Sequence, residues 1–333
     1  MRVRFWGTRG SSPHVVSHDA VPALVRRVLD LGRAHGLTTL AELDAALAAG
    51  ALPGPLAYGG HTPCLEIAAG GAGVYVDMGT GLRAASLAAT ARNQREFHFF
   101  LTHLHWDHLM GLPFFLPIFL KDHRIVVHHV HRNAPEHVRG LFNGVNFPVK
   151  WEQLGAAVTF DELKLYQPVT VEGMTVTPFA LDHPGGSFGY RFEAGGASAA
   201  MGFDSEYVRT SPKQLGRDLP FYQSLDLLVV DAQYEIEDYL HKFDWGHGSP
   251  MIGIDLALRE QIRSLVFMHH DPAATEAVLD ASFKRAEAYL QEQWPKFKDA
   301  WAARDPAGPK LHAAYDGLEV EVVGAVGALR RSA

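Results

Sequence analysis

Three histidines and one aspartate stand within six positions of the chain, in the run His103-Leu104-His105-Trp106-Asp107-His108. An apolar stretch, 97–101, comes directly before it. At the end of a strand, residues two apart point to the same side, so His103 and His105 can share one metal ion. Asp107 and His108 lie where the chain must turn and can face a second ion. Imidazole and carboxylate together suit zinc and other first-row divalent ions. A solvated histidine-rich loop is the alternative interpretation.

Further ligand candidates downstream favour the metal interpretation, because each follows a predicted strand. His183 comes just after the stretch 174–180, and Asp204 ends a short apolar run. The apolar stretch 264–268 is followed by two histidines, His269 and His270. Either of these rings could turn inward. We favour His269 because it follows the last apolar strand residue directly.

The ordered series of motifs resembles the metallo-β-lactamase superfamily, and within it the ribonuclease Z-like phosphodiesterase branch. The segments 4–13, 58–62 and 269–272 look most like the anti-Pycsar-type cyclic-nucleotide phosphodiesterases of that branch. The matching segments are Gly59-Gly60-His61-Thr62-Pro63-Cys64, Val76-Asp77-Met78-Gly79-Thr80-Gly81, the 103–108 run, His183, Asp204, Asp231-Ala232-Gln233-Tyr234, Gly246-His247-Gly248-Ser249 and His269.

The resemblance implies a site for two divalent metal ions, with zinc favoured and manganese as the alternative. It assigns the first ion to His103, His105 and His183. It assigns the second ion to Asp107, His108 and His269, and it makes Asp204 the bridge between the two. Asp77 would support a ligand ring from behind by accepting its hydrogen bond. Turn chemistry alone would also place an aspartate before glycine at this position.

His247 indicates phosphodiester cleavage. It lies in a glycine-flanked loop that leads into a predicted helix over 250–261, with Ser249 as the residue before the helix. In the family, the matching histidine touches the scissile phosphate or protonates the leaving oxygen, and Asp231 matches the carboxylate that hydrogen-bonds it. Asp107 would orient a metal-bridging hydroxide that attacks the phosphate. The alternative is that His247 only fills a turn.

Composition narrows the class of protein and the size of its substrate. The formal net charge is −7, and no dense block of lysine and arginine is present, which weighs against a grip on long nucleic acid. No glycine- and basic-rich arm separates the second and third metal-binding motifs. A single cysteine, Cys64, no visible signal peptide and no apolar stretch near the roughly 20 residues of a membrane span favour a cytoplasmic protein.

These observations together predict a cytoplasmic dinuclear-metal phosphodiesterase that hydrolyses 3′,5′-cyclic nucleotides and, like its relatives, forms a homodimer. A ribonuclease Z-like endonuclease that processes RNA 3′ ends is the second interpretation. A hydrolase of another small ester, such as a lactonase or a phosphorylcholine esterase, is the third. The fourth interpretation is not an enzyme: a regulatory or structural metal-binding module that has lost turnover. The aromatic residues proposed to stack on a base are Phe142, Phe147, Tyr234 and Tyr239.

The elements that must position these residues form two βββα-like halves, each with strands followed by helices. Together with the resemblance they predict an α/β fold, an αββα sandwich formed by one domain over 1–333, with a helical insertion at about 17–57 that could act as packing, a dimer contact or a lid. A hairpin across Asp316-Gly317 is predicted near the end of the chain. The strands are predicted at 1–6, 62–69, 73–78, 97–101, 125–130, 156–160, 174–181, 187–194, 197–203, 226–231 and 264–269, and the helices at 20–35, 39–49, 80–93, 250–261 and 273–293.

Overall fold

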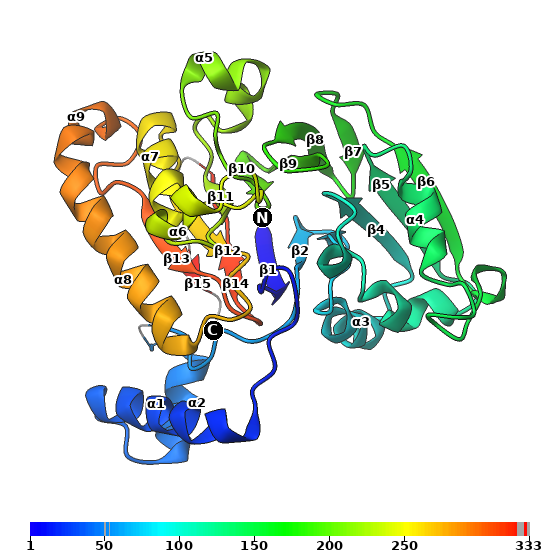
Figure 1. Ribbon diagram of the computed structural model, residues 1–333, viewed down its shortest axis with the longest axis horizontal. Helices are drawn as coiled ribbons and strands as arrows, with labels where there is room; N and C mark the ends of the chain where they lie inside the picture. Colours follow the sequence, from blue (N-terminus) through cyan, green and yellow to red (C-terminus); the bar gives the residue numbers. More distant parts are fainter. Residues whose placement is uncertain (50, 53, 325–329, 332–333) are drawn as a thin grey trace.

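Two β-sheets pack face to face, and helices cover the outer side of each (Figure 1). The predicted αββα sandwich is therefore confirmed. The computed structural model describes residues 1–49, 51–52, 54–324 and 330–331. One sheet has the order β15-β14-β1-β2-β3-β4-β5-β6, and the other has the order β13-β12-β11-β10-β9-β8-β7.

The strands of the first sheet are β1 (Arg2–Gly7), β2 (Cys64–Ala68), β3 (Val74–Val76), β4 (Glu96–Leu101), β5 (Arg124–His129), β6 (Ala157–Glu162), β14 (Glu319–Glu321) and β15 (Arg330–Arg331). Those of the second are β7 (Val169–Val171), β8 (Met174–Leu181), β9 (Ser187–Ala194), β10 (Ala197–Gly202), β11 (Leu227–Asp231), β12 (Ser264–Met268) and β13 (Lys310–Ala313). The α-helices are α1 (Val21–Ala34), α2 (Leu40–Ala48), α3 (Leu82–Ala91), α4 (Ala134–Gly140), α5 (Pro212–Leu215), α6 (Ile236–His241), α7 (Pro250–Glu260), α8 (Glu276–Gln293) and α9 (Lys298–Trp301).

Alternation along the central strands divides the core into layers. In β11, Leu227 and Val229 point into the space between the sheets, whereas Leu228 and Val230 pack on the other face with α7 and α8. Successive side chains of a strand point to opposite faces, so a strand covered on both faces is apolar throughout. This explains why β11 and β12 have the unbroken apolar sequences that marked them as strands.

Parallel pairing brings the ends of several strands to one edge of the sandwich. β3 and β4 are parallel neighbours in the first sheet, and β10, β11 and β12 are parallel neighbours in the second. Parallel strands have their carboxyl ends at the same edge, and loops at such edges are where binding groups gather. Each of these strands ends at or within three residues of a predicted site residue: Asp77, His103, Asp204, Asp231 and His269.

The predicted hairpin across Asp316-Gly317 is wrong. β13 pairs in parallel with β12 in one sheet, while β14 pairs with β1 in the other. The turn carries the chain across the sandwich, because the N–H of Asp316 donates to the carbonyl of Tyr58 and that of Gly317 donates to the carbonyl of Phe5. Contacts with distant strands therefore override the local turn signal. The sequence signal was local, whereas β13 pairs with β12 and β14 pairs with β1 from the start of the chain.

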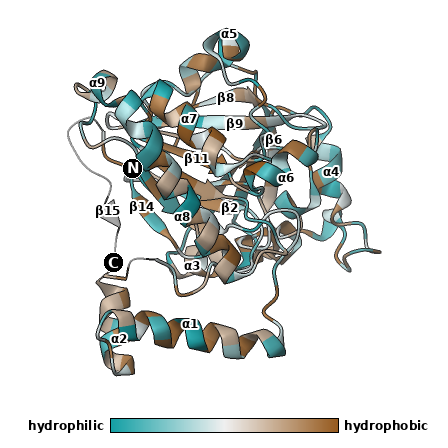
Figure 2. Ribbon diagram, turned by 60° about the vertical axis from the view of Figure 1, so that its left-hand side comes forward, coloured by the Kyte–Doolittle hydropathy of each residue, from teal (hydrophilic) through white to brown (hydrophobic). Residues whose placement is uncertain are grey.

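The helices expected within 17–57 are present as α1 and α2, which lie beside the sandwich near the start of α8 (Figures 1 and 2). Arg27 joins α1 to α8 through an ion pair with Asp280, and it also donates to the carbonyls of Pro55 and Leu56. The helix α1 is only partly packed on the body of the protein, since its apolar residues Val21, Val25 and Leu29 remain exposed.

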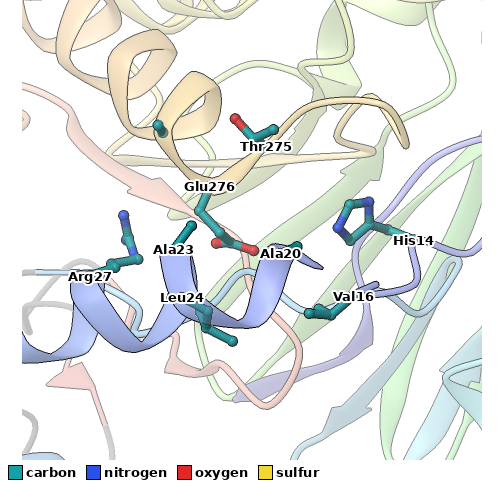
Figure 3. A pocket seen from close by; sticks show the side chains of 9 residues that line it. His14, Val16, Ala20, Ala23, Leu24, Arg27, Thr275 and Glu276 are labelled. Carbon is teal, nitrogen blue, oxygen red and sulfur yellow. The ribbon is translucent and has the colours of Figure 1, made fainter. Parts of the chain in front are cut away.

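A largely apolar cavity of about 330 Å³ lies between α1 and the first turn of α8, with His14 and Glu276 among its lining residues (Figure 3). Among the described residues, no helix is long and apolar enough to cross a bilayer.

Candidate metal centre

The first group of predicted ligands forms one cluster. His103 and His105 follow β4, and His183 follows β8 in the other sheet. One ring nitrogen from each of the three lies within 4.8 Å of the others. Nδ1 of His105 is 3.2 Å from Nε2 of His183. His103 is buried and His105 is exposed, so the group runs from the interior to the surface.

The second group lies directly beside the first, and its three members are buried. Oδ2 of Asp107 is 3.2 Å from Nε2 of His108 and 3.2 Å from Nε2 of His269. The ring centroids of His103 and His108 are 4.2 Å apart. His269 comes from the end of β12, so this group also joins the two sheets.

Asp204 occupies the position between the two groups. Its Oδ2 is 3.2 Å from Nε2 of His108, and its Oδ1 is 3.1 Å from Nε2 of His269. Oδ1 is also 3.9 Å from Nε2 of His103 in the first group. One carboxylate therefore faces both sets of rings, as the bridging role expected for this residue requires.

Unpartnered buried atoms test whether these residues fit a cation. Nε2 of His103, Nε2 of His108 and Oδ2 of Asp204 are all buried, and although the last two lie 3.2 Å apart, none of the three makes a hydrogen bond of acceptable geometry. The three residues offer ligand atoms within 4.8 Å of one another. A buried polar atom without a partner is costly, and three that converge on one point are rare unless something binds there. Imidazole and carboxylate are the donors that divalent ions of the zinc type accept, so the residues fit the expected metal.

For five of the ligand residues the electrostatics favour the form that binds metal, whereas at His108 burial is outweighed by the carboxylates of Asp204 and Asp107, which raise the pKa of that ring. Burial lowers the pKa of His103, His105 and His183, so these rings are neutral. Burial opposes ionisation of Asp107 and Asp204, but the neighbouring imidazole rings outweigh it and hold both pKa values below the ordinary range. Metal ligands must be deprotonated, and neutral imidazole and carboxylate are the forms that coordinate an ion.

Several polar groups hold the ligand side chains in place from behind. Asp77 is 2.7 Å from Nδ1 of His108 and accepts hydrogen bonds from the N–H and the hydroxyl of Thr102. Nδ1 of His183 is 2.8 Å from the carbonyl oxygen of Gly246. Such partners fix the orientation of a ligand ring, which is the role expected for Asp77.

Sequence reasoning gave no role to two other supports. Oε1 of Gln233 is 2.8 Å from Nδ1 of His269, and the backbone N–H of Ser11 donates to Oδ2 of Asp107 at 2.8 Å. Gln233 stands two residues after Asp231 in a matched motif, and this spacing was the available signal. The contact from Ser11 has no such signal, because a backbone N–H is present at every residue except proline.

Three of the site residues adopt a left-handed backbone. φ is +61° at Asp77, +56° at Asp204 and +60° at His269, each just after a strand. Aspartate and histidine are among the non-glycine residues that enter this region more often. A residue held there costs of order 1–3 kcal/mol, and such positions cluster at functional sites. The sharp turn redirects each side chain from its strand toward the common centre.

The structure separates the two adjacent histidines after β12. His269 lies in the cluster, whereas Nε2 of His270 is 2.9 Å from the carbonyl oxygen of Ala314. The His270 ring also packs edge-on against Tyr58, with centroids 5.4 Å apart. His270 therefore joins the end of β12 to neighbouring segments and faces away from the cluster.

His247 lies next to the cluster and is paired with Asp231. Its Nδ1 is 2.9 Å from Oδ2 of Asp231, and its ring stacks on that of His269 with centroids 4.8 Å apart. Burial by itself lowers the pKa of His247, but Asp231 outweighs this effect and raises the pKa to about 9. Within the described part of the chain no hydrogen bond engages Nε2 of His247. That atom is the one left to meet a substrate.

The aromatic residues proposed to stack on a base are mostly occupied elsewhere. Phe142 is buried in the core beside Phe147 and Trp151, so it offers no face to a ligand. Tyr234 is also buried, and its ring contacts that of His247 edge-on. For Phe142 the expectation is wrong, because the 140–151 loop folds back onto the sheet.

In sequence, the chain is similar to beta-lactamase superfamily proteins, including two ribonuclease Z proteins. A sequence model of the beta-lactamase superfamily domain matches residues 74–270. The chain is 28% identical to ribonuclease Z of Staphylococcus carnosus over 178 residues, which are 49% of this chain and 52% of the relative. It is 27% identical to ribonuclease Z of Archaeoglobus fulgidus over 130 residues, 39% of this chain and 41% of the relative. The chain thus spans about half the length of the curated relatives it matches, or less.

Solved structures with the same fold cover nearly the whole chain. The metallo-beta-lactamase fold protein YhfI from Bacillus subtilis superposes with a TM-score of 0.60 at 14% identity, covering 96% of this chain and 98% of that one. The short form of human tRNase Z gives a TM-score of 0.59 at 14% identity, covering 97% and 100%. Unliganded yeast PDE1 gives 0.54 at 15% identity, covering 80% and 96%. At these identities the similarity concerns the fold alone.

Because His269 lies in the cluster and His270 does not, we expect alanine variants of the two residues to differ in metal content. We expect His269→Ala to lower bound metal from about two equivalents per chain to one or fewer, because a second-group ligand is lost. His270→Ala should keep its metal while losing about 1–3 kcal/mol of unfolding free energy, because the Ala314 carbonyl loses its partner. Elemental analysis and chemical denaturation measure the two effects. Equal metal loss in both variants would contradict the assignment.

Asp77→Asn should weaken metal binding by about 10- to 100-fold, because the orienting carboxylate behind His108 is lost. Asparagine tolerates the left-handed backbone of this position, so the variant isolates the charge. Asp122→Asn is the matched control, since Asp122 also has a positive φ, of +65°, but is exposed. Competition against a chromogenic chelator measures the affinity. If both variants bind metal as tightly as the parent protein, Asp77 stabilises only the backbone turn and does not orient His108.

Proposed function

The chain belongs to the beta-lactamase superfamily, whose domain model matches residues 74–270, and from this we propose that it is a metal-dependent phosphodiesterase that hydrolyses 3′,5′-cyclic nucleotides. The observation that carries the proposal is the His247–Asp231 pair beside the histidine–aspartate cluster. A purely structural metal site is closed by its ligands and has no use for a positioned acid at its side. A phosphodiester needs both a cationic site and a proton for its leaving oxygen.

In this proposal His103, His105 and His183 hold one divalent ion, while Asp107, His108 and His269 hold a second, with Asp204 shared between them. Zinc is the ion that the mixed nitrogen and oxygen donors favour, and manganese is the alternative. When bound, paired divalent ions lower the pKa of water, neutralise phosphate oxygens and favour an in-line displacement.

The chain's own residues supply the remaining steps. Asp107, held by the N–H of Ser11, orients the attacking water. As the water oxygen bonds to phosphorus it releases a proton to solvent, and the bond from phosphorus to one ribose oxygen breaks. His247 donates a proton from Nε2 to that leaving oxygen, while Asp231 keeps Nδ1 engaged and the ring in position. The product is a nucleoside monophosphate.

Two observations support a small substrate. The formal net charge of −7 disfavours a grip on a long polyanion. Between the second and third metal-binding motifs the chain forms β5, α4, β6, β7 and β8, which belong to the sandwich and its outer layer, and no arm protrudes from this described stretch. The homodimer expected from the resemblance also stays part of the proposal.

The second candidate function is processing of RNA 3′ ends. The matches to two ribonuclease Z proteins favour it specifically. Both candidates use the same chemistry at the cluster and differ in the size of what must reach it. A substrate assay therefore separates them.

Metal-loaded protein should open 3′,5′-cyclic AMP or cyclic GMP and leave a transfer RNA precursor uncut. Chromatography of the nucleotide products and gel analysis of the RNA, with the same protein preparation, measure both activities. Removal of metal with a chelator should abolish turnover, and added zinc or manganese should restore it. Cleavage of the precursor without hydrolysis of any cyclic nucleotide would replace the first proposal by the second.

His247→Ala should lower kcat by about 10²- to 10⁴-fold, the range contributed by a general acid, while metal content stays unchanged. His137→Ala is the control, because His137 is exposed on α4 outside the cluster and should leave kcat unaltered. Steady-state kinetics and elemental analysis on the same samples measure this. Full activity in His247→Ala would remove the proposed acid from the mechanism.

A further inference from the structure

Two of the six tryptophans of the chain are exposed: Trp106 stands between two cluster residues, and Trp245 precedes Gly246, whose carbonyl contacts His183. Trp106 is 68% exposed and Trp245 is 62% exposed. The other four, Trp6, Trp151, Trp294 and Trp301, are buried or half-buried. A tryptophan is a large apolar side chain that normally loses most of its exposed surface on folding. Two exposed rings at the same site therefore indicate a surface that binds something.

The backbone contacts place both tryptophans at the rim of the cluster. Trp106 stands between His105 and Asp107, which are both cluster residues. Trp245 precedes Gly246, whose carbonyl oxygen is 2.8 Å from Nδ1 of His183. A side chain at Gly246 would approach this ring nitrogen to 2.2 Å, so the backbone here lies directly against the ligand. Since His183 and His105 are themselves in contact, the two segments meet at one rim.

The segment that carries Trp245 is anchored, although its side chain is exposed. The N–H of Asp244 donates to Oε1 of Glu206 at 2.7 Å, and the N–H of Trp245 donates to the carbonyl of Lys242 at 3.2 Å. Asp244 and Gly246 on either side have positive φ values of +68° and +85°. These turns fix the backbone and leave the indole ring directed to solvent.

The same segment contributes a positive charge near the proposed acid. Nζ of Lys242 lies 4.1 Å from the ring centroid of Tyr234, and that ring contacts the ring of His247 with centroids 5.6 Å apart. A cation at this rim suits an anionic ligand, in contrast to the negative net charge of the chain. The rim thus combines aromatic faces with a cation, and these two features suit a nucleotide.

We infer that Trp106 and Trp245 are specificity-determining residues that stack on a nucleobase of the substrate while its phosphate lies at the cluster. The inference rests on the proposed phosphodiesterase function, and it identifies the nucleobase as the part of the substrate that the rim recognises. Stacking on an aromatic side chain tolerates any base, because every base has a π-face. The rim therefore favours nucleotides over phosphodiesters that lack a nucleobase, and it discriminates little among the bases.

The test compares 3′,5′-cyclic AMP with ribose 3′,5′-cyclic phosphate, which has the same ester and no base. Trp245→Ala and Trp106→Ala should each raise KM for cyclic AMP by about tenfold, with kcat within about twofold, and leave the base-free substrate unaffected. Trp245→Phe should restore KM for cyclic AMP, because phenylalanine keeps an aromatic face. Leu87→Ala, on the exposed face of α3, is the control and should change neither substrate. Metal content is measured for every variant.

The outcomes separate this inference from the proposed function. If the parent protein cleaves both substrates and the tryptophan variants alter both equally or neither, the inference is overturned and the phosphodiesterase proposal stands. If a precursor RNA is cleaved instead, the same comparison is made with RNA carrying an abasic nucleotide beside the scissile bond. If nothing is cleaved, calorimetric titration decides: tighter binding of AMP than of ribose 5-phosphate, lost in Trp245→Ala, supports the inference, and equal binding overturns it.

Discussion

Charge balance at the edge of the sandwich is the constraint on which the structure depends. Asp107 and Asp204 are buried and ionised, and they face the rings of His108 and His269 at 3.1–3.2 Å. A buried charge is tolerated only when it is compensated, and a buried polar atom only when it has a partner. A divalent cation satisfies both demands at once. The polar residues behind the cluster, Asp77 and Gln233, then serve to keep the rings aimed at that cation.

The fold meets this constraint by bringing strand ends from two sheets to one place. β4 delivers His103, and β10 and β12 deliver Asp204 and His269 from the opposite sheet. If each strand simply continued, these side chains would keep alternating between the two faces of the sheet. The left-handed backbone at Asp77, Asp204 and His269 turns these three side chains toward the cluster, and the packing of the strands offsets the energetic cost of that conformation. The core between the sheets is thus the support of the site as well as the source of stability.

The residues beside the cluster bear on which reaction a metal site of this kind performs. His247, in the same loop as Trp245, pairs with Asp231 at the end of β11, and this pair is the proton donor of the proposed function. The Gly246 carbonyl within that loop orients His183. One short segment therefore contains the carbonyl that orients His183, the proposed proton donor His247 and the proposed base-stacking residue Trp245. The small anionic substrate of the proposed function agrees with the formal net charge of −7 and with the cation Lys242 near His247.

The sequence by itself predicted the layers of the fold and the side chains that gather at the edge, because apolar strands with polar residues at their ends are local patterns and because the ordered motifs resemble a known family. It proposed His269 over His270, and the structure places His269 in the cluster and His270 against Ala314. Only the tertiary structure decided that β13 and β14 belong to different sheets, that Phe142 is buried, and that Trp106 and Trp245 are exposed. It also decided that the Ser11 N–H supports Asp107 and that Val21, Val25 and Leu29 of α1 stay exposed. Each of these depends on which distant segment packs against a residue, and a local pattern carries no information on that partner.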